Sequence, residues 1–148
     1  MEHGHQSVVQ LLVEAGANIE VYNEDGTPLI YAAAAGNGNV VEYLLKKGAD
    51  VHHADEFGRT ALHAAASKGD VKAAKALIEY GAEVDEVKPR DEDGNTALLL
   101  AAAEGHMDVI KSLLDKGANA HYINHCGDTA LQQAKIYKHE SVVKLLGE

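Results

Sequence analysis

The chain has 148 residues, enough for one compact domain or one short array of repeats. Its composition, 46% hydrophobic and 24% charged, is that of a folded protein, and no uninterrupted apolar run approaches the length of a membrane span. A formal net charge of -10 disfavours nonspecific binding to nucleic acid or to anionic lipid. The single cysteine, Cys126, excludes an intrachain disulfide framework and indicates a reducing intracellular compartment, cytoplasmic or nuclear.

The first predicted element is a helix over Gln6–Ala15, in which Val8, Val9, Leu12 and Val13 recur at helical spacing. The pair Gly4-His5 precedes it, and the same pair recurs as Gly105-His106 between two later predicted helices. The segment is therefore interpreted as the second helix of a unit whose first helix is missing. An apolar flank left without its neighbour is expected to allow self-association through the ends of the chain.

Four copies of one pattern follow this helix. They open at Gly26-Thr27, Gly58-Arg59-Thr60, Gly94-Asn95-Thr96 and Gly127-Asp128-Thr129, so that the threonines step from 27 to 60, 96 and 129, by 33, 36 and 33 residues. A glycine stands nine residues after each of the first three threonines, at Gly36, Gly69 and Gly105, and a Gly-Ala pair follows at Gly48-Ala49, Gly81-Ala82 and Gly117-Ala118. A fixed period near 33 residues indicates a repeat architecture.

The copy that opens at Thr60 shows how such a unit folds. The Thr60 hydroxyl can cap a short helix, which Gly69 ends because a left-handed turn is inexpensive only for glycine. Asp70 can then cap a second helix, in which apolar residues recur at helical spacing until Gly81. In the preceding copy, Pro28 suits the first helical position, where its missing N–H is not needed.

This pattern resembles the ankyrin-repeat family, whose Thr-Pro-Leu-His-x-Ala opening is matched most fully by Thr60-Ala61-Leu62-His63-Ala64-Ala65. The resemblance implies an all-α repeat solenoid, in which stacked helix-turn-helix repeats are joined by projecting β-hairpin fingers, and a structural role for His63. It implies a single domain over residues 1–148. The expected divisions are a partial repeat 1–22 and repeats at about 23–54, 55–90, 91–123 and 124–148.

Two departures from the pattern stand out. Gly81 to Gly94 spans 13 positions where Gly48 to Gly58 spans 10, and the added stretch places Lys88 and Arg90 around Pro89. Two interpretations stay open, a tolerated loop insertion and a contact loop. In the last repeat, Lys138 stands where a glycine is expected.

The sequence offers little for catalysis or for a metal. His52 and His53 fall in one predicted finger, and His121 and His125 fall in another two repeats away, so three or four zinc ligands do not converge. A His-Glu-x-x-His pattern, a phosphate-binding glycine loop and a nucleophile grouping are missing as well. We expect no metal, no cofactor and no enzyme activity.

What remains is a recognition surface, and its positions are carried over from the resemblance to the family. The expected partner-binding residues lie at finger tips and at the ends of first helices: Glu24, Asp25, Glu56, Phe57, Arg59, Ser67, Lys68, Lys88, Arg90, Glu92, Asp93, Asn95, Glu104, His125, Asp128 and Tyr137. The expected function is a non-catalytic scaffold that binds a protein or peptide. The alternative is a stand-alone inhibitor or regulator that clamps an enzyme.

Two features of this surface indicate the kind of partner. Phe57, the only phenylalanine, is predicted at a finger tip, either as an interface anchor or folded back onto the next finger. Acidic residues gather in or beside the fingers, among them Glu20, Asp55 and Asp85, whereas many lysines fall in second helices. The concave and finger-tip face is therefore expected to be acidic and to attract a basic protein or peptide.

Overall fold

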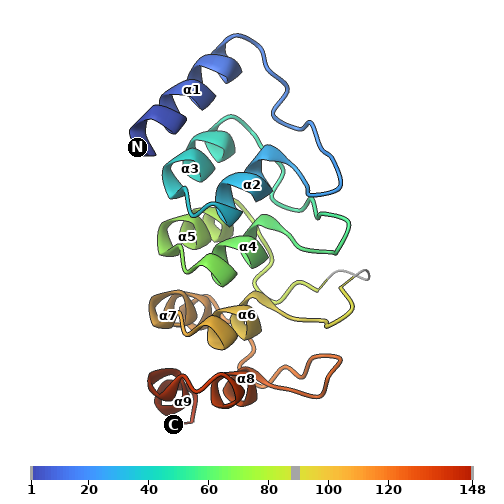
Figure 1. Ribbon diagram of the computed structural model, residues 1–148, viewed down its shortest axis with the longest axis vertical. Coiled ribbons are helices and arrows are strands. Elements are labelled where there is room, and N and C mark those ends of the chain that lie inside the picture. The colour runs from blue at the N-terminus through green and yellow to red at the C-terminus, as the bar shows by residue number, and fades with distance from the viewer. Residues whose placement is uncertain (1, 88–90, 148) are drawn as a thin grey trace.

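The computed structural model describes residues 2–87 and 91–147. Within these ranges the helices are α1 (Glu2–Glu14), α2 (Pro28–Ala34), α3 (Gly38–Lys46), α4 (Ala61–Lys68), α5 (Val71–Glu79), α6 (Ala97–Glu104), α7 (Met107–Asp115), α8 (Ala130–Ile136) and α9 (Glu140–Leu146). The first helices α2, α4, α6 and α8 form one column, and the second helices form another that begins with α1 and α3 (Figure 1). The expected all-α repeat solenoid is confirmed.

Each first helix begins at a threonine whose hydroxyl oxygen accepts a hydrogen bond from the backbone N–H three residues later. The donors are Ile30, His63, Leu99 and Gln132. At Thr60 and Thr129 the side chain of that third residue also accepts a hydrogen bond from the threonine N–H, which completes a capping box. The capping role predicted for Thr60 is confirmed, and Pro28 occupies the first position of α2 as expected.

The ends of the helices follow the residue types as well. Gly69 ends α4 in the left-handed conformation with φ 80°, and the Asp70 carboxylate accepts a hydrogen bond from the Ala73 N–H at 3.0 Å, which caps α5. Lys138 adopts the same conformation with φ 62°, as the single non-glycine residue with positive φ in the described parts of the chain. The chain therefore keeps the turn that glycine would have made easy.

Leucine and alanine fill the interior. The first helices bury Leu29, Leu62 and Leu98, the second helices bury Leu44, Leu77 and Leu113, and alanines such as Ala33, Ala65 and Ala101 lie where neighbouring helices meet. Each leucine buried in this way stabilises the fold by about 1.5 to 3 kcal/mol. Because the packed residues come from successive repeats, one continuous core runs along the stack.

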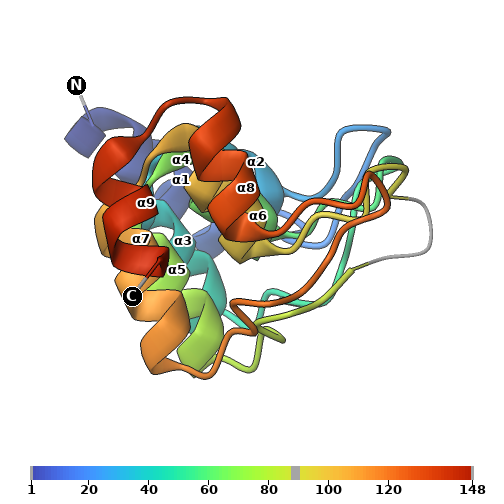
Figure 2. The ribbon, with the colours of Figure 1, turned by 90° about the horizontal axis from the view of Figure 1, so that it is seen from below.

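The fingers are the four segments that join a second helix to the next first helix. We number them finger 1 (residues 15–27), finger 2 (47–60), finger 3 (80–96, with 88–90 outside the described residues) and finger 4 (116–129). They project together from one side of the helical stack (Figure 2). In the described segments, the expected hairpin pairing is limited to two isolated antiparallel bridges, Asn23–Gly26 and Ala54–Thr60.

The first helix differs from the prediction at its start. α1 begins at Glu2, before the predicted start at Gln6, and so includes Gly4 and His5. At Gly105 and His106 the same pair forms the turn after α6, because a first helix precedes it there. Without a preceding helix to turn away from, the chain before Gln6 continues the helix.

Candidate functional site

The fingers and the first helices enclose a concave cavity of about 430 Å³. Its floor comes from Ile30 in α2, Ala64 in α4 and Leu100 in α6, and its rim includes Ser67 and Lys68 near the end of α4. Tyr31 closes one side, where its hydroxyl donates a hydrogen bond to Asp25 Oδ2 at 3.0 Å. The cavity thus joins the two groups of positions that were predicted separately.

Tyr31 and Leu100 are lining residues that sequence reasoning missed. Both stand four positions after a helix-opening threonine, as Ala64 does. The residues in this slot of the three repeats differ in size and polarity, although the flanking residues repeat. A variable position inside a regular pattern was the signal that could have located the floor of the cavity.

Phe57 lies at the outer end of finger 2 with 54% of its surface exposed. The guanidinium carbon of Arg59 lies 5.4 Å from the centre of the Phe57 ring, and Arg59 Nε donates a hydrogen bond to Asp55 Oδ2 at 2.8 Å. Asp55 itself is buried. The buried carboxylate therefore holds Arg59, and Arg59 supports one side of an exposed aromatic ring.

An asparagine or aspartate side chain closes each finger: Asn23, Asp55, Asp91 and Asn124. These side chains accept hydrogen bonds from the backbone N–H two residues on, at 3.0 Å for Asp25, 3.0 Å for Phe57, 3.1 Å for Asp93 and 3.0 Å for Cys126. Such side chains favour tight turns for this reason. The signal was present in the sequence, since the residue stands five positions before the threonine, or four in the shorter finger 1.

Neighbouring fingers are joined in two places near their tips. The Glu56 N–H donates to the Glu24 carbonyl oxygen at 3.1 Å, and the His125 N–H donates to the Asp93 carbonyl oxygen at 2.9 Å. Asn124 Nδ2 also donates to Asn95 Oδ1 at 2.8 Å. The fingers therefore form two pairs, finger 1 with finger 2 and finger 3 with finger 4.

Fingers 2 and 3 are arranged differently. Their outer ends enclose a cleft of about 630 Å³ lined by Glu56, Phe57, Arg59, Asp91, Glu92 and Asp93. Asp91 turns its carboxylate to the N–H groups of its own finger. Glu56, Glu92 and Asp93 are exposed, so the cleft has an aromatic wall and an acidic rim.

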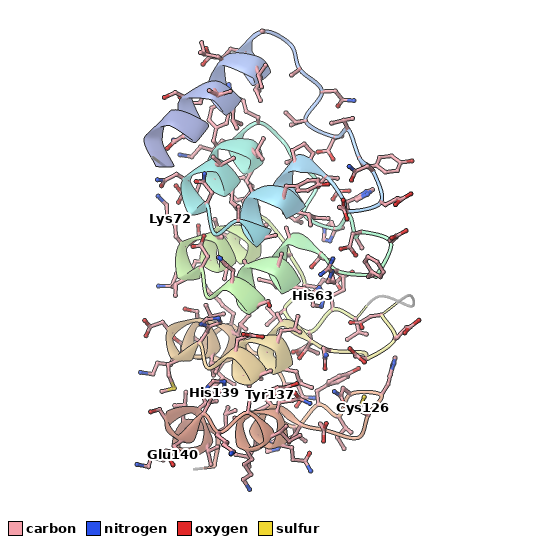
Figure 3. The ribbon with its side chains drawn as sticks, in the orientation of Figure 1. His63, Lys72, Cys126, Tyr137, His139 and Glu140 are labelled. Carbon is pink, nitrogen blue, oxygen red and sulfur yellow. The ribbon has the colours of Figure 1, made fainter. Side chains whose placement is uncertain are left out.

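The predicted binding residues fall into four groups. Exposed on the fingers are Glu24, Asp25, Glu56, Phe57, Arg59, Glu92, Asp93 and His125, and half-buried there are Asn95 and Asp128. Exposed near the ends of first helices are Ser67, Lys68, Glu104 and Tyr137. Lys88 and Arg90 lie outside the described residues. Tyr137 lies on the helical stack, well away from Cys126 in finger 4 (Figure 3).

Three acids that the sequence assigned to the surface field serve the fold. Asp55 is buried and paired, as described above. Glu20 Oε1 accepts a hydrogen bond from the Asp50 N–H at 2.8 Å, and the Asp85 carboxylate accepts one from the Asn119 N–H at 3.0 Å, so both link successive fingers. The exposed negative charge is therefore narrower than expected and centres on Glu24, Asp25, Glu56, Glu92 and Asp93.

His63 lies at the base of the cavity and joins fingers 2 and 3. Its Nδ1 atom lies 3.1 Å from the Thr60 backbone nitrogen, and its Nε2 atom lies 2.9 Å from the Glu86 carbonyl oxygen. Burial lowers the pKa of His63, and the hydrogen bond to the Glu86 carbonyl opposes this in part. These contacts confirm the structural role that the family resemblance implied.

In residues 2–87 and 91–147, three or more His, Cys, Asp or Glu side chains do not gather as a metal site would require. Cys126 is exposed in finger 4. No helix in these ranges has the length and hydrophobicity of a transmembrane segment.

The comparison with protein families agrees with the architecture. The family model described as ankyrin repeats (three copies) matches residues 1–88 and 85–148. The chain therefore belongs to the ankyrin-repeat family. Ankyrin repeats generally mediate protein–protein interactions and are typically non-catalytic. No curated protein matches the chain.

Proposed function

We propose that the concave cavity and the cleft between fingers 2 and 3 bind a basic protein or peptide, and that the chain acts as a scaffold without chemistry of its own. The observation that carries the proposal is Phe57. A large aromatic ring stands half exposed in a cleft, held by Arg59 and bordered by exposed carboxylates. Rigid aromatic side chains in such places are the usual anchors of protein interfaces.

The charges around Phe57 support a basic partner. Glu56, Glu92 and Asp93 are exposed on the rim of the cleft, whereas Arg59 is paired with Asp55. An arginine or lysine side chain could lay its alkyl stem on the Phe57 ring and place its charge among these carboxylates. The apolar floor formed by Ile30, Ala64 and Leu100 would accept an uncharged side chain farther along the same segment.

Affinity capture with a matched control tests the proposal. Wild-type chain is compared with the triple variant Phe57→Ala/Glu56→Ala/Glu92→Ala and with Tyr80→Ala/Glu79→Ala/Asp115→Ala. The control removes one exposed aromatic ring and two exposed acids in or next to the second helices α5 and α7. A partner captured by wild type and by the control, but not by the first variant, supports the proposal. Equal capture by all three chains contradicts it.

The intracellular setting, cytoplasmic or nuclear, remains part of the proposal and rests on the single cysteine. A basic partner is also consistent with the formal net charge of -10, which disfavours nucleic acid and anionic membranes as ligands.

A further inference from the structure

The N-terminal end of the stack has an unfilled position. Gly16, which follows α1, has φ 92°, close to the 94° of Gly48 after α3 and the 89° of Gly117 after α7. α1 therefore stands in the register of a second helix, and it packs against α3 in the second-helix column. In the described chain, α3, α5, α7 and α9 each pack against the first helix of their own repeat, and α1 follows no such helix (Figure 1).

The side chains that would contact the missing helix are exposed. Val8 and Leu12 are 55% and 56% exposed. They stand eight and four positions before Gly16, and the residues in these two positions before Gly48, Gly81 and Gly117 are all buried: Val40 and Leu44, Ala73 and Leu77, Val109 and Leu113. Val9 and Val13 pack against the core, so α1 is seated on one side and bare on the other.

Neighbouring residues extend this bare surface. Leu11 is 67% exposed, and Val21 and Tyr22 in finger 1 are exposed too. A small cavity of about 130 Å³ lies between Val21, Tyr22 and Pro28 at the start of α2. Solvent-exposed apolar surface of this kind marks a binding site more often than it is left bare.

We propose that this surface, formed by Val8, Leu11 and Leu12 beside the start of α2, binds one short helix of a second polypeptide. The repeat geometry defines the chemistry of that helix. The helices in the equivalent position beside α3, α5 and α7 present a leucine and alanines that are buried: Leu29 and Ala33, Leu62 and Ala66, Leu98 and Ala102. Small residues let the helix approach closely, and Glu14, Glu24 and Asp25, which are exposed nearby in sequence, favour a partner with basic ends.

A second copy of the chain fits this position poorly. Its last repeat consists of α8 and α9, which pack against each other. If its α8 occupied the unfilled position, its α9 would occupy the space of α1. If its α9 packed on α1 instead, the position beside α1 would stay unfilled. A separate helix meets neither obstacle, and the inference does not depend on the function proposed for the fingers.

A peptide taken from the chain itself provides the test. Residues 58–69 contain the Thr60 cap, α4, the terminal Gly69 and two basic residues, Arg59 and Lys68. A fluorescently labelled peptide of this sequence is titrated with the full chain, and binding is followed by fluorescence anisotropy. We expect saturable binding that Leu12→Glu weakens by at least about tenfold. Phe57→Ala, on the finger surface, is expected to bind like wild type.

Four outcomes would overturn the inference. They are no saturation at chain concentrations up to about 1 mM, equal affinity for wild type and Leu12→Glu, loss of binding in Phe57→Ala, and equal binding of a control peptide with Leu62→Asp. Sedimentation of the chain alone adds a further check. A homodimer that Leu12→Glu abolishes would show that a second copy is the occupant and would overturn the choice of a separate helix.

Discussion

His63 Nε2 lies 2.9 Å from the Glu86 carbonyl oxygen, and this contact joins fingers 2 and 3 across 23 residues of chain. The other ring nitrogen accepts a hydrogen bond from the Thr60 N–H within the capping box. Both bonds are made together by the neutral ring that carries its proton on Nε2. Protonation of Nδ1 would remove the acceptor for Thr60.

The first prediction concerns pH. The pKa of His63 in the folded chain is lowered from 6.5, mainly by burial, so the folded state binds this proton less readily than the unfolded state does. The stability that neutral His63 contributes is complete above pH 6.5 and decreases as the pH falls below 6.5. We expect the melting temperature to fall between about pH 7.5 and pH 5.5, with part of that fall due to His63.

His63→Gln isolates this part. Gln132 occupies the same place after Thr129, where its Oε1 accepts the Thr129 N–H at 2.7 Å, so glutamine keeps the capping box without titrating. The fall in melting temperature over the same pH range should be smaller in His63→Gln than in wild type, because all other histidines are unchanged. Equal falls in the two proteins would assign the pH dependence to other groups.

The second prediction concerns Asp55. Its buried carboxylate accepts hydrogen bonds from the Phe57 N–H, the Arg59 N–H and Arg59 Nε. Asp55→Ala leaves these donors without their acceptor, and we expect a loss of about 2 kcal/mol in the free energy of unfolding. Asp55→Asn should lose much less, because Asn124 closes finger 4 in the same way. Urea denaturation followed by circular dichroism measures both, and equal losses would refute the role of the turn.

These two residues show how far the sequence alone leads. The caps at Thr60 and Asp70 and the left-handed Gly69 were predictable, because they depend on residue type and on neighbours within a few positions. The exposure of Phe57 followed from the repeat register. The burial of Asp55 was not predicted, because it depends on how finger 2 folds around the carboxylate and on where Arg59 lies. The links from Glu20 and Asp85 to the next finger depend on distances between repeats, which no local pattern contains.

The third prediction concerns the rate of partner binding. If Glu56, Glu92 and Asp93 attract a basic partner, the association rate constant should fall as salt rises from about 50 mM to 500 mM, while the dissociation rate constant changes less. Glu92→Gln should reduce the salt dependence, and Glu79→Gln in α5 should not. Surface plasmon resonance with the captured partner measures both constants. An association rate that salt leaves unchanged would exclude electrostatic attraction.

The fourth prediction separates backbone strain from steric contact at two glycines. Gly48 and Gly69 both have positive φ, 94° and 80°, so alanine costs about 1 kcal/mol of backbone strain at either position. A Cβ atom at Gly48 would meet nothing within 4 Å, whereas one at Gly69 would lie 2.5 Å from His106 Nδ1. Gly69→Ala should therefore lower the free energy of unfolding by about 1 kcal/mol more than Gly48→Ala. Equal losses in urea denaturation would show that His106 moves aside freely.

The last prediction concerns Lys138, which has φ 62° where the chain uses Gly69 and Gly105 in earlier repeats. Lys138→Gly removes the cost of a left-handed lysine, and part of that gain is offset by the greater freedom of glycine in the unfolded chain. We expect a net gain of about 0.5 to 1 kcal/mol in the free energy of unfolding. Lys135→Gly is the matched control, since it removes the same charge from an exposed position inside α8 and should cost about 1 kcal/mol. A loss of stability in Lys138→Gly would mean that the lysine side chain makes a contact worth more than the strain.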